Sequence, residues 1–292
     1  MKVGLMGTGL MGLPMAQRLL EGGLLAIAYN RTPEKLEPLR TAGVEIAPSP
    51  QTLIHHSTCI VLMLTNAQAI RETLLTETTR GELAGKTVIQ MGTIAPTESQ
   101  LIRDEVVAAA GAYLEAPVLG SIPEAKAGKL IVMVGATPEQ FENYQPVFKC
   151  FGPEPILIGP VGTATATKLA LNQLIASLTA AFSTSLSFVM KYRVDIELFM
   201  QILRQSALYA PTFDKKLQRM VERNFANPNF PTKHLLKDNN LFLSEAKSLG
   251  INTRLVAAVS HILQQAIAMG LADEDYSALF SAIEEGGEGV IE

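Results

Sequence analysis

The sequence predicts an α/β protein in which an N-terminal doubly wound sheet precedes an all-helical domain with a long central helix. A glycine-rich turn joins a short apolar run to a helical pattern at the start of the chain. Short apolar runs then alternate with helical patterns through the first half. Beyond about residue 161 only helical patterns follow, so we expect one domain over residues 1–161 and a second over 162–292.

The composition is that of an ordinary globular protein. Its 292 residues are 48% hydrophobic and 18% charged, and the formal net charge is −4. This mild acidity speaks against nucleic acid or an anionic membrane as a partner. The two cysteines, Cys59 and Cys150, predict no disulfide framework and a reducing compartment. We see no cationic leader and no apolar run of transmembrane length, so we expect a cytoplasmic protein.

The first half contains eight apolar runs with the length of buried strands. Helical patterns separate several of them, and Thr32-Pro33-Glu34 has the N-cap, proline and acid of a helix start. Because the strands are almost continuously apolar, we expect a mostly parallel sheet with both faces covered. The predicted strands are Val3–Met6, Leu25–Tyr29, Val44–Ile46, Cys59–Leu64, Thr87–Met91, Tyr113–Glu115, Leu130–Val134 and Pro155–Ile158, and the helices include Pro33–Ala42, Pro96–Ala110 and Pro138–Cys150.

The turn after the first strand is the glycine fingerprint of a Rossmann-type dinucleotide-binding domain. Gly7 allows the tight turn, Gly9 lets a pyrophosphate approach the backbone, and Gly12 lets helix and strand pack closely. The helix that follows offers free N–H groups and a positive dipole end to the phosphates. The predicted cofactor-binding residues of this turn are Gly7, Thr8, Gly9, Leu10, Met11 and Gly12.

The end of the second predicted strand favours NADP over NAD. NAD-binding versions of the fold carry an acidic residue there, which bonds the ribose 2′-hydroxyl. This chain instead reads Asn30-Arg31-Thr32. Arg31 can pair with a 2′-phosphate, helped by Asn30 and the Thr32 hydroxyl. The alternative is that Arg31 is a solvated loop residue and Glu34 reaches back to the ribose.

The second half begins with a long pattern, Ala164 to about Tyr192, that is too apolar for an exposed helix and predicts a central buried one. Lys168 and Asn172 are four residues apart and share a face of it. Polar groups on a buried helix must be satisfied or functional, so either they belong to a site or Lys168 snorkels and Asn172 bonds a loop. Further helices are predicted at Ile196–Gln205, Phe213–Val221, His234–Leu249, Thr253–Met269 and Tyr276–Ile283, before a frayed tail at Gly286–Glu292.

Taken together, these motifs resemble the β-hydroxyacid dehydrogenase family, which includes 3-hydroxyisobutyrate dehydrogenases and the glyoxylate and succinic semialdehyde reductases. The resemblance runs essentially from end to end. It is carried by Gly7–Gly12 with Met15-Ala16, Asn30-Arg31-Thr32, Met63-Leu64, Gly92–Pro96, Glu115–Val118, Gly162–Asn172, and Lys233-His234 with Lys237-Asp238.

The resemblance implies roles for four residues near the reacting atoms. Lys168 matches the family's catalytic lysine and Asn172 its substrate-orienting asparagine. Thr93 matches a residue near the nicotinamide and the substrate, unless it caps the turn before Pro96. Phe230 matches the aromatic residue that closes the pocket in the glyoxylate and semialdehyde reductase branch, unless it is a core residue.

The resemblance also extends the cofactor site. Leu64 and Thr65 match a backbone segment that lines it. Lys237 matches a cofactor contact from the second domain, and Asp238 is its acidic neighbour on the substrate side. The alternative for Lys237 and Asp238 is a solvated ion pair.

One motif departs from the family pattern. The substrate-binding segment reads Glu115-Ala116-Pro117-Val118-Leu119-Gly120-Ser121, and Leu119 replaces a usual serine. The backbone N–H groups of Gly120 and Ser121 remain to hold a substrate carboxylate. The loss of the hydroxyl favours a longer or more apolar acid than glyoxylate.

The residues and the resemblance together imply NADPH-dependent reduction of a small aldehyde or keto acid of the succinic semialdehyde or glyoxylate type, with Lys168 as general acid. No metal is expected, because His55, His56, His234 and His261 form no ligand-spaced cluster. The cleft is expected between the domains and the assembly is expected to be a homodimer or homotetramer. Three alternatives are a 3-hydroxyisobutyrate-type dehydrogenase that oxidises a β-hydroxy acid with NAD(P), an imine reductase, and a non-catalytic NADP-binding sensor or scaffold.

Overall fold

The chain, described here from a computed structural model over residues 1–285, folds into two compact units. The first is Met1–Lys168 and the second begins at Leu169. The predicted boundary between residues 161 and 162 precedes helix α9 (Thr163–Lys191), whereas the two units part inside that helix. The predicted tail at 286–292 lies outside the described residues.

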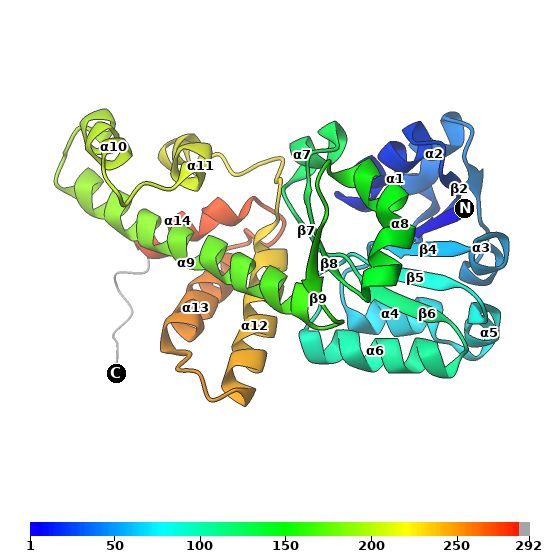
Figure 1. Cartoon of the computed structure of the whole chain (residues 1–292). Coiled ribbons are helices and arrows are strands. Elements are labelled where there is room, and N and C mark those ends of the chain that lie inside the picture. The colour runs from blue at the N-terminus through cyan, green and yellow to red at the C-terminus, as the bar shows by residue number, and fades with distance from the viewer. Residues whose placement is uncertain (286–292) are drawn as a thin grey trace. The chain divides into compact units, whose positions relative to one another are not determined.

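The first unit contains one mostly parallel sheet, as the sequence predicts (Figure 1). The strand order is β3-β2-β1-β4-β5-β6-β8-β7, and β9 pairs with β8. Pairing is parallel from β3 to β6, whereas β8 is antiparallel to both β6 and β7. The strands are β1 (Val3–Met6), β2 (Leu25–Tyr29), β3 (Glu45–Ile46), β4 (Cys59–Leu62), β5 (Thr87–Gln90), β6 (Ala112–Glu115), β7 (Val118–Leu119), β8 (Ile131–Gly135) and β9 (Ile156–Gly159).

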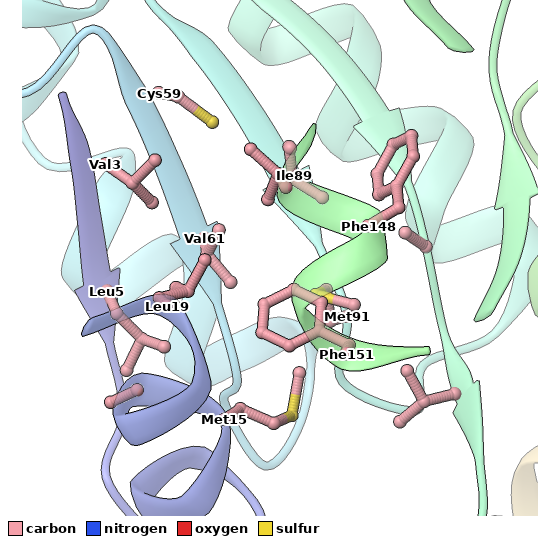
Figure 2. Close-up of a cluster of buried hydrophobic side chains, with 14 of the residues drawn as sticks. Val3, Leu5, Met15, Leu19, Cys59, Val61, Ile89, Met91, Phe148 and Phe151 are labelled. Carbon is pink, nitrogen blue, oxygen red and sulfur yellow. The ribbon is translucent and has the colours of Figure 1, made fainter. Parts of the chain in front are cut away.

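Helices cover both faces of this sheet. Figure 2 shows one face, where Met15 and Leu19 of α1 and Phe148 and Phe151 of α8 lie over the side chains of the strands. Helices α3, α4 and α6 supply Ile54, Ile70 and Ile102 to the core of the other face. The helices of this unit are α1 (Gly12–Glu21), α2 (Glu37–Thr41), α3 (Pro50–His56), α4 (Ala67–Leu74), α5 (Glu77–Arg80), α6 (Pro96–Ala108), α7 (Ile122–Ala127) and α8 (Pro138–Phe151).

Two local predictions in this unit are corrected, and one short strand was not predicted. Strand β4 ends at Leu62 and not at Leu64, so Leu64 lies in the loop that follows the strand. The segment predicted as one helix begins with a 3-10 turn over Pro33–Leu36, and the Thr32 side chain makes no capping hydrogen bond. Strand β7 has only two residues and no prediction, because its pairing with β8 depends on contacts far apart in sequence.

The second unit is all helical and packs around α9. Figure 1 shows α10 and α11 beside one half of α9 and α12 and α13 beside the other. Two apolar clusters correspond to these halves, one built on Ala176 and Ala180 and one on Phe182 and Leu186. The remaining helices are α10 (Ile196–Gln205), α11 (Pro211–Glu222), α12 (Thr232–Ser248), α13 (Arg254–Ala268) and α14 (Leu279–Glu285).

Helix α9 is not buried all round, which corrects the prediction. One face packs into the two clusters, but a second face leaves Leu174 51% and Phe188 61% exposed. By length and composition alone α9 is apolar enough to cross a membrane, so the expectation of no such run is also wrong. We call the second face the exposed stripe of α9: Ala166, Ala170, Leu174, Leu178, Ala181, Ser185, Phe188 and Tyr192.

The start of α9 is fixed by Glu115 at the end of β6. This carboxylate is fully buried, and its Oε1 accepts hydrogen bonds from the N–H groups of Gly162, Ala164 and Thr165 at 2.9–3.0 Å. Its Oε2 accepts from the hydroxyls of Ser99 and Thr165. Burial raises the pKa of Glu115, and these donors oppose the rise. The carboxylate thus satisfies free N–H groups at the positive end of the helix.

Candidate functional site

The glycine turn after β1 is shaped by two close approaches within the first unit. Gly7 has a φ of +98°, and a Cβ on it would collide with the carbonyl oxygen of Met63 in the loop after β4. A Cβ on Gly12 would collide with the carbonyl oxygen of Gly7. Both glycines are therefore required by the packing of the turn itself.

Gly9 differs from these two glycines, because a Cβ on it would meet nothing within 4 Å. Packing gives no reason for a glycine at this position, but close approach of a ligand to the backbone does. Beside it, the Thr8 hydroxyl is buried and has no hydrogen-bond partner in the described part of the chain. An open glycine, an unused hydroxyl and the N-terminus of α1 fit the pyrophosphate of a dinucleotide.

The end of β2 is linked to the same turn. Asn30 Oδ1 accepts from the Thr8 N–H at 3.0 Å, and Asn30 Nδ2 donates to the Thr32 carbonyl at 2.9 Å. Asn30 therefore orders the loop that carries Arg31 with both ends of its amide. Arg31 is exposed and forms no ion pair with any described carboxylate. Glu34 is exposed as well.

The loops after β4 and β5 meet at the same carboxyl edge of the sheet. A Cβ on Gly92 would collide with the carbonyl oxygen of Leu64, so these two loops are in backbone contact. Leu64 and Thr93 are half-buried and Thr65 is exposed. Because β1 and β4 are neighbours from which the sheet is wound in opposite directions, this edge is the switch point where such folds bind ligands.

In the predicted carboxylate-binding turn, the hydrogen-bond donors of Ser121 are already used by a side chain of the protein. Gly120 is exposed with a φ of +131°. The N–H and the hydroxyl of Ser121 both donate to Glu124 Oε2, at 2.8 and 2.6 Å, as a capping box of α7. Leu119 pairs with Ile131 across β7 and β8. Sequence reasoning missed this use of Ser121, although Ser-x-x-Glu was there to read.

Asn172 and Asp238 meet inside the second unit. Asn172 Nδ2 donates to Asp238 Oδ2 at 2.7 Å, and both side chains are buried. Only the NH₂ group of the amide can face a carboxylate, so Asn172 Oδ1 points elsewhere, and it has no partner among the described residues. Lys168 lies one turn earlier on α9 and is half-buried. The Asn172–Asp238 pair thus leaves Asn172 Oδ1 as a buried hydrogen-bond acceptor on the helix that carries Lys168.

The remaining predicted residues, Lys237 and Phe230, also belong to the second unit. Lys237 Nζ lies 2.8 Å from Asp238 Oδ1, and Lys237 is 24% exposed, so the pair is not the solvated one that the alternative describes. Phe230 is half-buried, and its ring lies 5.8 Å from that of Tyr276 in an edge-on contact. The Asp238 carboxylate therefore bonds both an amide and an ammonium group.

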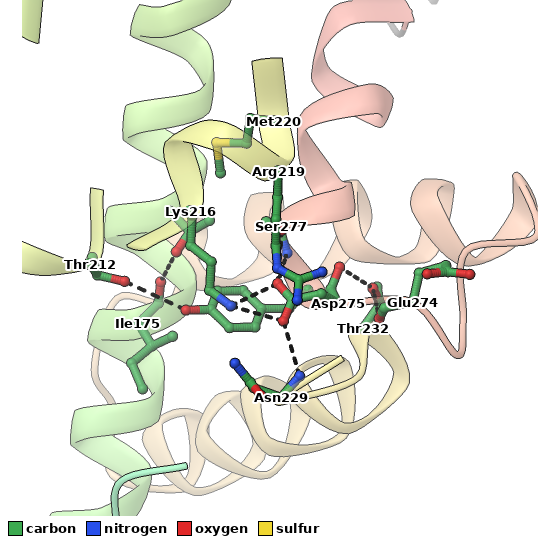
Figure 3. A network of polar contacts seen from close by, with 12 residues as sticks. Ile175, Thr212, Lys216, Arg219, Met220, Asn229, Thr232, Glu274, Asp275 and Ser277 are labelled. Atoms are coloured by element: carbon green, nitrogen blue, oxygen red, sulfur yellow. Dashed lines mark hydrogen bonds and ion pairs between the residues drawn. The ribbon is translucent and has the colours of Figure 1, made fainter. Parts of the chain in front are cut away.

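A buried ion pair in the second unit was not predicted. Lys216 Nζ lies 2.8 Å from both carboxylate oxygens of Asp275 (Figure 3). The sequence pattern that could have predicted a buried lysine is on α11, where Lys216 falls on the same face as Phe213 and Met220. A charged residue within an apolar stripe requires a partner, although the sequence does not name Asp275 as that partner.

The chain matches known proteins along nearly its whole length. Residues 2–159 match the family described as the NAD binding domain of 6-phosphogluconate dehydrogenase. Residues 162–283 match the family described as NAD-binding of NADP-dependent 3-hydroxyisobutyrate dehydrogenase.

Individual relatives agree with these matches. The 2-hydroxy-3-oxopropionate reductase of Escherichia coli (strain K12) is 32% identical over 97% of both chains. Glyoxylate/succinic semialdehyde reductase 1 of Arabidopsis thaliana is 30% identical over 97% of this chain and 98% of its own. The fold resembles that of the Mycobacterium tuberculosis 3-hydroxyisobutyrate dehydrogenase, with a TM-score of 0.87, 20% identity and coverage of 97% and 98%.

Gly9→Ala is expected to leave the fold intact and to weaken NADP binding by about 10-fold or more, because a methyl group would occupy the space left for the pyrophosphate. Thermal unfolding and titration calorimetry with NADP would measure the two effects. Gly12→Ala is the matched control and should lose stability first, since its Cβ collides with Gly7. A Gly9→Ala protein that binds NADP as tightly as the parent would contradict the assignment.

Proposed function

Because this chain belongs to the β-hydroxyacid dehydrogenase family of NAD(P)-dependent oxidoreductases, we propose that it reduces a small carboxylate-bearing aldehyde or keto acid to the hydroxy acid with NADPH. The observation that carries the proposal is the buried Asn172–Asp238 pair beside Lys168 on α9. This arrangement supports a proton donor held ready at one end of a helix. A sensor or scaffold would not require a lysine beside such a pair.

The substrate class is taken from the shared chemistry of the relatives. Their names describe a glyoxylate/succinic semialdehyde reductase and a 2-hydroxy-3-oxopropionate reductase. Each named substrate joins an aldehyde to a carboxylate within a short chain. Leu119 removes a hydroxyl from the predicted carboxylate-binding turn, and the Ser121 donors are used by Glu124. Both features favour a longer or more apolar acid than glyoxylate.

The cofactor would be held by the glycine turn and by the end of β2. The N–H groups at the start of α1 and the Thr8 hydroxyl would bind the pyrophosphate. Arg31 would pair with the 2′-phosphate, which its exposure and its lack of a described carboxylate partner support. When bound, NADPH supplies the hydride for the reduction.

Lys168 would donate the proton. Its ammonium group would hydrogen-bond the carbonyl oxygen, stabilise the negative charge that develops there and then protonate it. The hydrogen bonds of the Asn172 amide indicate which group this residue can orient. One N–H of its NH₂ group donates to Asp238, and its Oδ1 is a buried acceptor with no partner among the described residues. Asn172 would therefore use Oδ1 to orient the Lys168 ammonium group or the hydroxyl of the product, while Lys168 hydrogen-bonds the carbonyl oxygen.

We propose that a second copy of the chain covers the exposed stripe of α9. The stripe repeats every three or four residues along the helix and combines small side chains with large, mostly apolar ones, as in a helix–helix seam. It carries no charged residue, because the charges of α9 are Lys168 and Lys191 alone. A homodimer or homotetramer would bury this surface.

Lys168→Ala is expected to lower turnover by about two to four orders of magnitude, the range for loss of a positioned acid, while NADPH binding is kept. NADPH oxidation would be followed with succinic semialdehyde, glyoxylate and methylmalonate semialdehyde side by side. Lys191→Ala, at the other end of the same helix, is the control and should match the parent. A Lys168→Ala enzyme with most of its activity would refute the role of Lys168, and a parent inactive on all three would refute the substrate class.

Arg31→Glu is expected to raise the KM for NADPH by about 10- to 100-fold, because it replaces a charge-assisted bond to the 2′-phosphate by repulsion. The KM for NADH should change little. Arg40→Glu makes the same change of charge on exposed α2 and should leave both constants near the parent values. Equal loss with both cofactors would instead indicate that Arg31 supports the loop.

Leu178→Glu is expected to reduce the mass measured by light scattering to that of a single chain, because a carboxylate would have to be buried in the seam. Leu249→Glu, which is 74% exposed in the parent and lies after α12, is the control. A parent that is already a single chain in solution would contradict the proposed assembly.

A further inference from the structure

Lys216 and Asp275 form the most completely buried ion pair of the described chain. The Asp275 side chain is fully buried and that of Lys216 is 9% exposed. The ammonium group lies 4.3 Å from the centroid of the Tyr276 ring. Burial lowers the pKa of Lys216. Because apolar replacement of a buried ion pair often leaves stability unchanged or improves it, stability alone does not account for this pair.

The contacts of Asp275 lead to the segment that carries Phe230. Its Oδ1 accepts from the N–H and the hydroxyl of Ser277 at 3.1 and 2.8 Å, and its Oδ2 accepts from the Asn229 N–H at 3.3 Å. Figure 3 shows this carboxylate between Lys216, Ser277 and Asn229. One carboxylate thus fixes the loop before α14 against the residue that precedes Phe230.

Phe230 is held from both sides by the same loop. The Tyr276 N–H donates to the Phe230 carbonyl at 3.0 Å, and the Phe230 ring packs edge-on against the Tyr276 ring. Pro231 and Asp275 form an isolated antiparallel bridge, and the Thr232 N–H donates to the Glu274 carbonyl at 2.8 Å. Both the backbone and the ring of Phe230 therefore depend on where Asp275 and Tyr276 are held.

We propose that Lys216 and Asp275 are a positioning pair that sets the Phe230 ring for substrate recognition. The inference rests on the proposed function and on the role that the family resemblance implies for Phe230, which is to close the substrate pocket. Two contacts of Lys216 would hold the Phe230 ring in position. Its ammonium group neutralises Asp275, and it lies over the Tyr276 ring on which Phe230 packs. Neither residue needs to touch the substrate.

Lys216→Met is expected to raise the KM for the aldehyde acid by about 3- to 10-fold, the value of a lost aromatic packing contact, with kcat and the KM for NADPH little changed. Lys216→Arg should restore most of the parental KM. The decisive measurement is a double-mutant cycle with Phe230→Ala. If Lys216 acts through Phe230, Lys216→Met adds no further rise in KM to Phe230→Ala.

Two further variants separate positioning from stability. Lys216→Met with Asp275→Asn removes both buried charges and keeps an acceptor oxygen at position 275 for the Ser277 and Asn229 donors, so it should fold even where the single variant does not, and its KM should rise as well. Arg223→Met removes the cation of the more exposed Arg223–Glu284 pair in the same unit and should leave the KM unchanged.

The outcomes distinguish this inference from the proposed function. If Phe230→Ala has the parental KM, the pocket role of Phe230 is wrong, and the positioning inference falls with it. If Phe230→Ala raises the KM but folded Lys216→Met does not, the positioning inference alone is overturned. Independent effects of the two changes, multiplied in the double variant, would also overturn it, because they would indicate a general loss of structure.

Discussion

The geometry at the start of α9, the helix that carries Lys168 and Asn172, depends on the buried carboxylate of Glu115. It joins the end of β6 to the N–H groups that begin α9, and it is held by backbone and hydroxyl donors. Lys168 follows within the first turns of that helix and Asn172 one turn later. The sheet makes room for the carboxylate through Gly135, where a Cβ would lie 2.6 Å from it. The sheet therefore sets the position of Lys168, which we propose as the proton donor.

Much of the fold could be predicted because its signals are local. The apolar run Val3–Met6 and the amphipathic pattern Ile196–Gln205 have the observed bounds of β1 and α10. The glycine fingerprint was equally readable, since Gly7 and Gly12 serve contacts within the turn and with its neighbouring loop. Family resemblance then named Lys168 and Asn172, which spacing alone left open between a site and a satisfied structural pair.

The features that escaped prediction depend on contacts far apart in sequence. The two residues of β7 are too few to carry a pattern, and their partners lie on β8. Composition could not predict that one face of α9 is exposed. A helix that is buried on all sides and a helix with one exposed apolar face can have similar apolar sequences. The engagement of Asn30 by Thr8 and the pairing of Lys216 with Asp275 likewise join segments that no local rule connects.

The two apolar faces of α9 have a consequence for how the chain acquires its structure. During synthesis α9 is complete once Lys191 is made, and α10 and α11, which cover one half of its buried face, follow soon after it. Helices α12, α13 and α14, which cover the other half, begin only at Thr232, Arg254 and Leu279. In that interval half of the buried face and the whole exposed stripe of α9 are bare, and such apolar surfaces are prone to aggregation. The last helices of the chain therefore protect a helix that is made well before them.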